Sequence, residues 1–259
     1  MKDKIKILFI SLLGALLMLS GCDFLDIEPH GELDDKAVWS SKIQVDKIMA
    51  SMYSAMDVLN LHQDEPWVGL SDECDLAWAV YSTFSKNLGN WSEYDTFGDK
   101  YERKYQAIRQ TLELEQNIHR CTEIGAIEQR NYIAEARFLR AYYYWQLLRQ
   151  YGPIVLMDDV YSYNSDFSQF MRSPYDECVD HIVDLLKQAE EGFYDDFPSA
   201  TDIARPRKIT CKALKSIVLH HAASPQFNGG YAKYANFKNP DGVQLISTTY
   251  DENKWKKAA

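Results

Sequence analysis

The residues best suited to chemistry lie in an aromatic segment from His62 to Gly98, which shows no sustained helical or strand period. Indole and phenol rings stack on the C–H faces of sugar rings, while carboxylates accept hydrogen bonds from hydroxyl groups. The segment therefore predicts a ligand-binding surface with the candidates Trp67, Asp72, Glu73, Trp78, Tyr81 and Trp91. The structural alternative is that these tryptophans pack the segment against neighbouring helices.

The acids of this segment, Asp72, Glu73 and Asp75, also allow a hydrolytic interpretation. A glycosidase needs two carboxyl groups held about 5 to 9 Å apart across one glycosidic bond, and the sequence does not fix such a distance. No GxSxG, Walker or HExxH motif is present. We therefore expect no enzymatic activity. A helical glycoside hydrolase is the weakest of three hypotheses, after a ligand-binding protein and an interaction scaffold.

Cysteine and histidine residues do not form a recognisable ligand set. Cys178 and His181 lie three residues apart, and His220 and His221 are adjacent, but no third ligand follows at metal-binding spacing. We expect no metal and no cofactor. Cys74, Cys121, Cys178 and Cys211 are widely spaced, so we expect them to be free or structural thiols.

The start of the chain has the layout of an export signal. Three lysines precede an uncharged apolar run from Ile7 to Leu19, which is shorter than the roughly 20 residues needed to span a bilayer. The residues that follow, Leu19 to Cys22, resemble a bacterial lipobox. We expect residues 1–21 to be removed, Cys22 to be lipidated, and residues 22–36 to form an extended leader.

Composition excludes one class of partner. The chain of 259 residues has a formal net charge of -10 and a pI of about 5.1. Such a charge repels a phosphate backbone, so nucleic acid is not an expected ligand.

Helical patterns dominate after the leader. The apolar spacing predicts helices over about 37–59, 105–118, 129–151, 173–192 and 210–222. Ser173 is the predicted N-cap of the fourth, Gly152-Pro153 the predicted stop of the third, and Asp251 the predicted cap of a short last helix. The only strand candidates are Ile154 to Met157 and Val243 to Ser247.

These elements predict an all-α fold with tetratricopeptide-like helical repeats and a long irregular aromatic-rich loop region. Because the loops differ in length, an irregular helical bundle is the alternative. The last helix stops after about two turns without a terminating residue, from which we expect the chain to be a fragment.

Several stretches resemble the SusD/RagB family of nutrient-binding outer-membrane lipoproteins of Bacteroidetes. The most specific runs from Ala134 to Tyr144 (AEARFLRAYYY) and leads into Leu148 to Pro153 (LRQYGP). Further matches are CDFLD at Cys22, NLGNWS at Asn87 and ASPQFNGG at Ala223.

The resemblance implies a non-catalytic protein that binds oligosaccharide or polysaccharide at the cell surface. It further implies a lipid anchor in the outer membrane and delivery of ligand to a SusC-like TonB-dependent transporter. In this interpretation residues 37–259 are the N-terminal helical region, and Trp78 and Tyr81 lie where the starch-binding branch carries a stacking tryptophan and a polar neighbour. The competing hypothesis is a lipidated helical-repeat scaffold or a peptide-binding member of the family.

Overall fold

The computed structural model describes residues 35–56, 68–71, 82–92, 94, 98–162, 164–195 and 203–259. The chain divides into two compact units, Met1–Val38 and Trp39–Ala259. Of the first unit only the short helix α2, Asp35–Val38, is described. The second unit contains the helical body.

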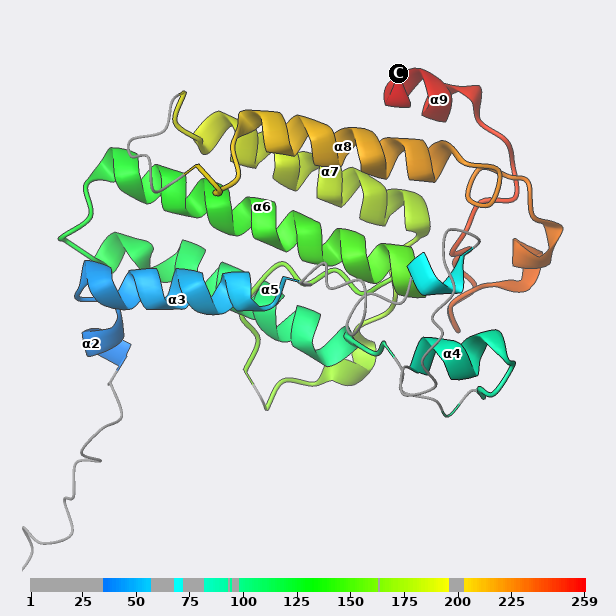
Figure 1. The fold of residues 1–259 in the computed structure, drawn as a ribbon, viewed down its shortest axis with the longest axis horizontal. Helices are drawn as coiled ribbons and strands as arrows, with labels where there is room; N and C mark the ends of the chain where they lie inside the picture. The colour runs from blue at the N-terminus through cyan, green and yellow to red at the C-terminus, as the bar shows by residue number, and fades with distance from the viewer. Residues whose placement is uncertain are drawn as a thin grey trace, which may run out of the picture. The chain divides into compact units, whose positions relative to one another are not determined.

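The long helices of the second unit lie side by side and pack on one another, whereas the short helix Ser82–Asn87 packs on the 3₁₀ helix Val68–Leu70 (Figure 1). The described helices of this unit are α3 (Lys42–Ser54), α4 (Ser82–Asn87), α5 (Tyr101–Asn117), α6 (Ala126–Tyr151), α7 (Tyr175–Gly192), α8 (Lys208–Ala223) and α9 (Glu252–Ala258). Short 3₁₀ turns lie at Val68–Leu70, Ile118–Arg120, Phe167–Gln169 and Ala232–Asn236. The described part of the chain contains no strand, which confirms the all-α prediction.

Helix α6 is the centre of this body, because α3, α5, α7 and α8 all pack against it. The sequence predicts one buried face, but Tyr143 and Tyr144 are also fully buried, so the helix is enclosed on nearly every side. It ends where Gly152 adopts a positive φ of 72° and donates its N–H to the Leu148 carbonyl over 3.0 Å. This confirms the predicted stop, since glycine adopts that conformation without a Cβ clash.

Helix α3 corrects a prediction. The single helix expected over 37–59 is interrupted, because Ser41 has an extended backbone and α3 begins only at Lys42. The Lys42 N–H donates to the Glu123 carboxylate over 2.7 Å. An acid at a helix N-terminus satisfies an otherwise unpaired donor, and here it comes from a distant segment that local pattern does not reveal.

The start of α7 is a second correction of the same kind. Ser173 is not the N-cap; Pro174 occupies that position without a side-chain hydrogen bond. Instead the Tyr175 N–H donates to the Leu245 carbonyl over 2.8 Å, and the Ser173 N–H donates to the Ile154 carbonyl over 2.8 Å. Both predicted strands are therefore extended connections that hold the start of α7, and the second contributes only an isolated bridge between Lys238 and Gln244.

The described cysteines are buried free thiols, as expected of structural residues. Burial raises the pKa of Cys178 to about 11 and that of Cys211 to about 12, so both stay protonated and unreactive near neutral pH. Cys121 is also fully buried. Cys74 lies outside the described residues.

Two arginines of α6 share one carboxylate of a neighbouring helix. Arg137 and Arg140 both contact Glu115 of α5. Glu135 is bound instead by Arg205 over 3.1 Å and by the Tyr53 hydroxyl over 2.7 Å. These pairs join residues that are distant in the sequence, so the partner of each charge is set by which helices pack together.

Candidate ligand-binding surface

Most of the predicted ligand residues cannot be placed. Trp67, Asp72, Glu73, Trp78 and Tyr81 lie outside the described residues, as does the predicted lipidation residue Cys22. Trp91 is described, and it is the starting point for the surface.

Trp91 follows α4 on a tight turn. Gly89 has a positive φ of 80°, and the turn is closed by hydrogen bonds from the Gly89 N–H to the Lys86 carbonyl and from the Asn90 N–H to the Ser85 carbonyl, both 2.9 Å. The Asn87 side chain donates to the Gly69 carbonyl over 2.8 Å, which joins the turn to the 3₁₀ helix Val68–Leu70. These hydrogen bonds fix the backbone conformation of the turn, although its sequence shows no regular secondary-structure pattern.

The rings on this turn face solvent. Trp91 is 67% exposed and Tyr94 is 85% exposed. Because hydrogen bonds hold the backbone at Trp91, its open ring can stack on a planar ligand with little loss of backbone entropy. Tyr94 belongs to the aromatic segment but was not among the predicted site residues; its position three residues after Trp91 is the signal that would have included it.

The segment after this turn is fixed to the C-terminal end of α6. Gln150 donates to the Gly98 carbonyl over 2.6 Å, and the Tyr151 hydroxyl donates to the Asp99 carboxylate over 2.7 Å. The Tyr101 N–H and the Tyr151 hydroxyl, both donating to Asp99, hold the pKa of that carboxyl below its usual value. The Asp99 carboxylate therefore serves as a structural acceptor here.

Four acids on the connections around α7 act as hydrogen-bond or ion-pair acceptors. A general acid for glycoside hydrolysis needs a raised pKa. Hydrogen bonds from Ser168 lower the pKa of Asp166, and Lys208 lowers the pKa of Asp195. Asp158 and Asp159 accept hydrogen bonds from Tyr161 and Gln116, both over 2.6 Å.

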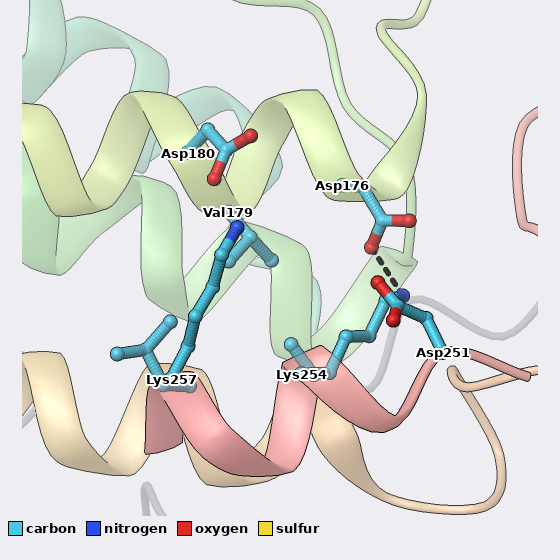
Figure 2. Close-up of a pocket in the computed structure, with 8 residues that line it drawn as sticks. Asp176, Val179, Asp180, Asp251, Lys254 and Lys257 are labelled. Atoms are coloured by element: carbon cyan, nitrogen blue, oxygen red, sulfur yellow. Dashed lines mark hydrogen bonds and ion pairs between the residues drawn. The ribbon is translucent and has the colours of Figure 1, made fainter.

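A small cavity of about 180 Å³ lies between α7, α8 and α9 (Figure 2). Lys254 of α9 bridges it by pairing with Asp176 over 2.6 Å and donating to the Phe227 carbonyl over 3.1 Å. Asp180 and Lys257 also line it, but no aromatic ring does. Ligand pockets usually measure 300 Å³ or more, so we assign this cavity to the packing of α9 on the bundle.

The fold and the exposed rings can now be compared with known proteins. Residues 23–217 match the SusD-like family model described as "Starch-binding associating with outer membrane". The chain belongs to this SusD-like family. The family's description associates its members with the outer membrane and with starch. No curated protein matches the chain significantly.

Solved structures give the same result. The protein BT4246 is 25% identical with a TM-score of 0.65, and the match covers 85% of this chain and 38% of that one. A SusD-like protein (BF3747) from Bacteroides fragilis is 26% identical with a TM-score of 0.59, covering 75% and 37%. A laminarin-binding SusD-like protein shares the fold at 13% identity and a TM-score of 0.54, covering 80% and 47%. The chain thus spans less than half the length of these structures.

None of the described helices of this SusD-like chain is long and apolar enough to cross a bilayer. The same described residues hold no group of three or more histidine, cysteine, aspartate or glutamate side chains placed to bind a metal ion.

Proposed function

We propose that this SusD-like chain binds oligosaccharide or polysaccharide at the cell surface without modifying it. The observation that carries the proposal is the family match over residues 23–217, whose description is starch-binding. The open faces of Trp91 and Tyr94 supply the chemistry that stacking on sugar rings requires. Trp67, Trp78 and Tyr81 extend the proposed stacking surface, and Asp72 and Glu73 accept sugar hydroxyls.

The proposed setting is the outer membrane. Residues 1–21 are the proposed signal peptide, Cys22 the lipid-bearing residue, and residues 22–36 the leader between lipid and helical region 37–259. Two acyl chains give stable attachment, since each buried methylene contributes about 0.8 kcal/mol. The bound glycan then passes to a SusC-like TonB-dependent transporter in the same membrane.

A binding experiment with the full-length protein tests the proposal. We expect calorimetric titration with amylose, laminarin and their trisaccharides to detect binding to at least one of them, with no release of reducing ends. Replacement of Trp91 by Ala should weaken that binding about tenfold or more, because the stacking face is lost while the exposed position tolerates the change.

The matched control is Trp255→Ala on α9, since Trp255 is 42% exposed and lies outside the aromatic segment. We expect this variant to bind like the wild type. Absence of binding to every glycan, or equal losses in both variants, would contradict the proposed function. Release of reducing ends would favour a hydrolase, and capture of a barrel transporter without sugar affinity would favour the scaffold hypothesis.

A further inference from the structure

A second group of rings lies on the connection between α6 and α7, far along the chain from Trp91. The ring of Phe170 lies 4.8 Å from that of Tyr161 and 5.7 Å from that of Phe167, centroid to centroid. Phe167 is 47% exposed. The rings therefore support one another while part of their surface stays in water.

A third group follows α8, at and beside the 3₁₀ helix Ala232–Asn236 in the orange part of Figure 1. The ring of Tyr234 lies 5.0 Å from that of Tyr231 and 6.3 Å from that of Phe237. Tyr231 is 43% exposed. The Gln244 side chain donates to the Tyr234 carbonyl over 2.6 Å, so the backbone beneath these rings is held in place.

Arg172 joins the two groups. Its guanidinium lies 4.9 Å from the centre of the Phe237 ring, and its carbonyl accepts a hydrogen bond of 2.7 Å from the Asn239 side chain. Phe170 lies two residues before Arg172 in the chain. The ring contacts and the Arg172–Phe237 contact connect six residues, called here the aromatic row: Phe167, Phe170, Arg172, Phe237, Tyr234 and Tyr231.

The row has the composition of a carbohydrate platform. Side chains that can bond hydroxyls accompany its planar groups: the Lys233 Nζ lies 5.8 Å from the centre of the Tyr231 ring, and the Gln226 side chain donates to the Tyr234 hydroxyl over 3.3 Å. Because the rings come from two separate loops, a ligand long enough to contact both, such as a polysaccharide, suits the row better than a single small sugar.

We propose that the aromatic row is a second glycan-binding site, which binds an extended polysaccharide chain and is separate from the Trp91 turn. The inference rests on the proposed carbohydrate-binding function and adds to it a preference for long chains. A short oligosaccharide occupies the Trp91 turn alone, while a long one also lies along the row.

The test compares long and short ligands in the full-length protein. The variant Phe167→Ala/Tyr231→Ala removes the two end rings of the row, which are partly exposed. We expect it to weaken binding of amylose or laminarin about tenfold and to leave binding of maltotriose or laminaritriose within twofold. Calorimetry and native gels cast with each polysaccharide measure both quantities.

The control is Tyr250→Ala, because Tyr250 is 60% exposed and lies outside the row. It should bind both ligand sizes like the wild type, and circular dichroism melting should show that both variants remain folded. If Trp91→Ala weakens polysaccharide binding while the row variant does not, the second site is refuted and the proposed function stands. If the wild type binds no polysaccharide, both fail, and loss of transporter association in the row variant without loss of glycan binding would identify the row as a protein contact instead.

Discussion

Aromatic residues of this chain lie in two contrasting environments: buried between α6 and the helices around it, or exposed on the loops. In α6, Tyr143 and Tyr144 are fully buried, and their hydroxyls donate to the carbonyls of Met52 and Met157. On the loops, Trp91 and Tyr94 keep most of their surface in water. The same ring chemistry therefore fixes the scaffold in one region and remains open for a ligand in the other.

The reason for the difference lies in the partners that each setting offers. Around α6, neighbouring helices supply apolar surface for the rings, and the extended segment after Gly152 supplies a carbonyl for the Tyr144 hydroxyl. On the Trp91 turn the backbone groups bond to one another locally, and the Trp91 ring stays 67% exposed. Substitutions of buried rings in α6 should therefore lower the free energy of unfolding, whereas substitutions of exposed rings on the loops should leave it nearly unchanged.

The largest effect should come from Tyr144→Ala. Loss of a fully buried aromatic ring costs about 3–5 kcal/mol of unfolding free energy, and here the hydrogen bond to Met157 is lost as well. Tyr94→Ala removes a ring of the same type that is 85% exposed, and we expect a change within about 0.5 kcal/mol. Chemical denaturation measures both, and similar costs would break the comparison between core and loop rings.

Glu115→Gln should have the next largest effect. Glu115 binds Arg137, with 2.7 Å between its Oε1 and the arginine Nε, and also contacts Arg140, whose side chain is only 7% exposed. Without the carboxylate a buried guanidinium loses its charge partner, which costs roughly 3 kcal/mol. The control Glu113→Gln breaks a partly exposed pair with Arg109 on the same helix and should cost less than about 1 kcal/mol.

The same pair predicts a dependence on pH. Burial opposes ionisation of Glu115, but the two arginines outweigh it and hold its pKa below the usual 4.5. A carboxyl with a lowered folded-state pKa stabilises the protein fully above pH 4.5 and loses that contribution as the pH falls further. Unfolding free energy measured between pH 5 and pH 3 should therefore fall less steeply in Glu115→Gln than in the wild type. An identical slope would show that the pair contributes nothing.

The smallest change in unfolding free energy is expected at Gly152, where α6 ends and the following connection begins. Gly152 ends α6 with a φ of 72° and a ψ of -141°, a conformation that side chains with a Cβ rarely adopt. Gly152→Ala should cost about 1–3 kcal/mol. Gly125→Ala, before the same helix, has an ordinary φ of -68° and open space around the added Cβ, so a change within about 0.5 kcal/mol is expected in melting experiments. Equal costs would show that the backbone at Gly152 is not under constraint.

The sequence predicted the helices well where the pattern is local and periodic. The stop at Gly152, the cap at Asp251 and the apolar faces of α5 to α8 are all present in the structure. The sequence-based prediction was wrong where the start of a helix depends on residues distant in the chain. Helix α3 begins where Lys42 contacts Glu123, and α7 begins where Tyr175 contacts Leu245. The aromatic row was missed for the same reason, because it joins two loops about 65 residues apart through the contact between Arg172 and Phe237.

The sequence by itself determined the helical class, the family resemblance and the presence of surplus rings, because periodicity and residue type are properties of short stretches. Only the tertiary structure decided which rings became core, which stayed open, and which acid each arginine found. Burial and pairing depend on neighbours that packing brings together. Because α3, α5, α7 and α8 pack on α6, its aromatic rings are buried, whereas rings on the loops can remain exposed to solvent.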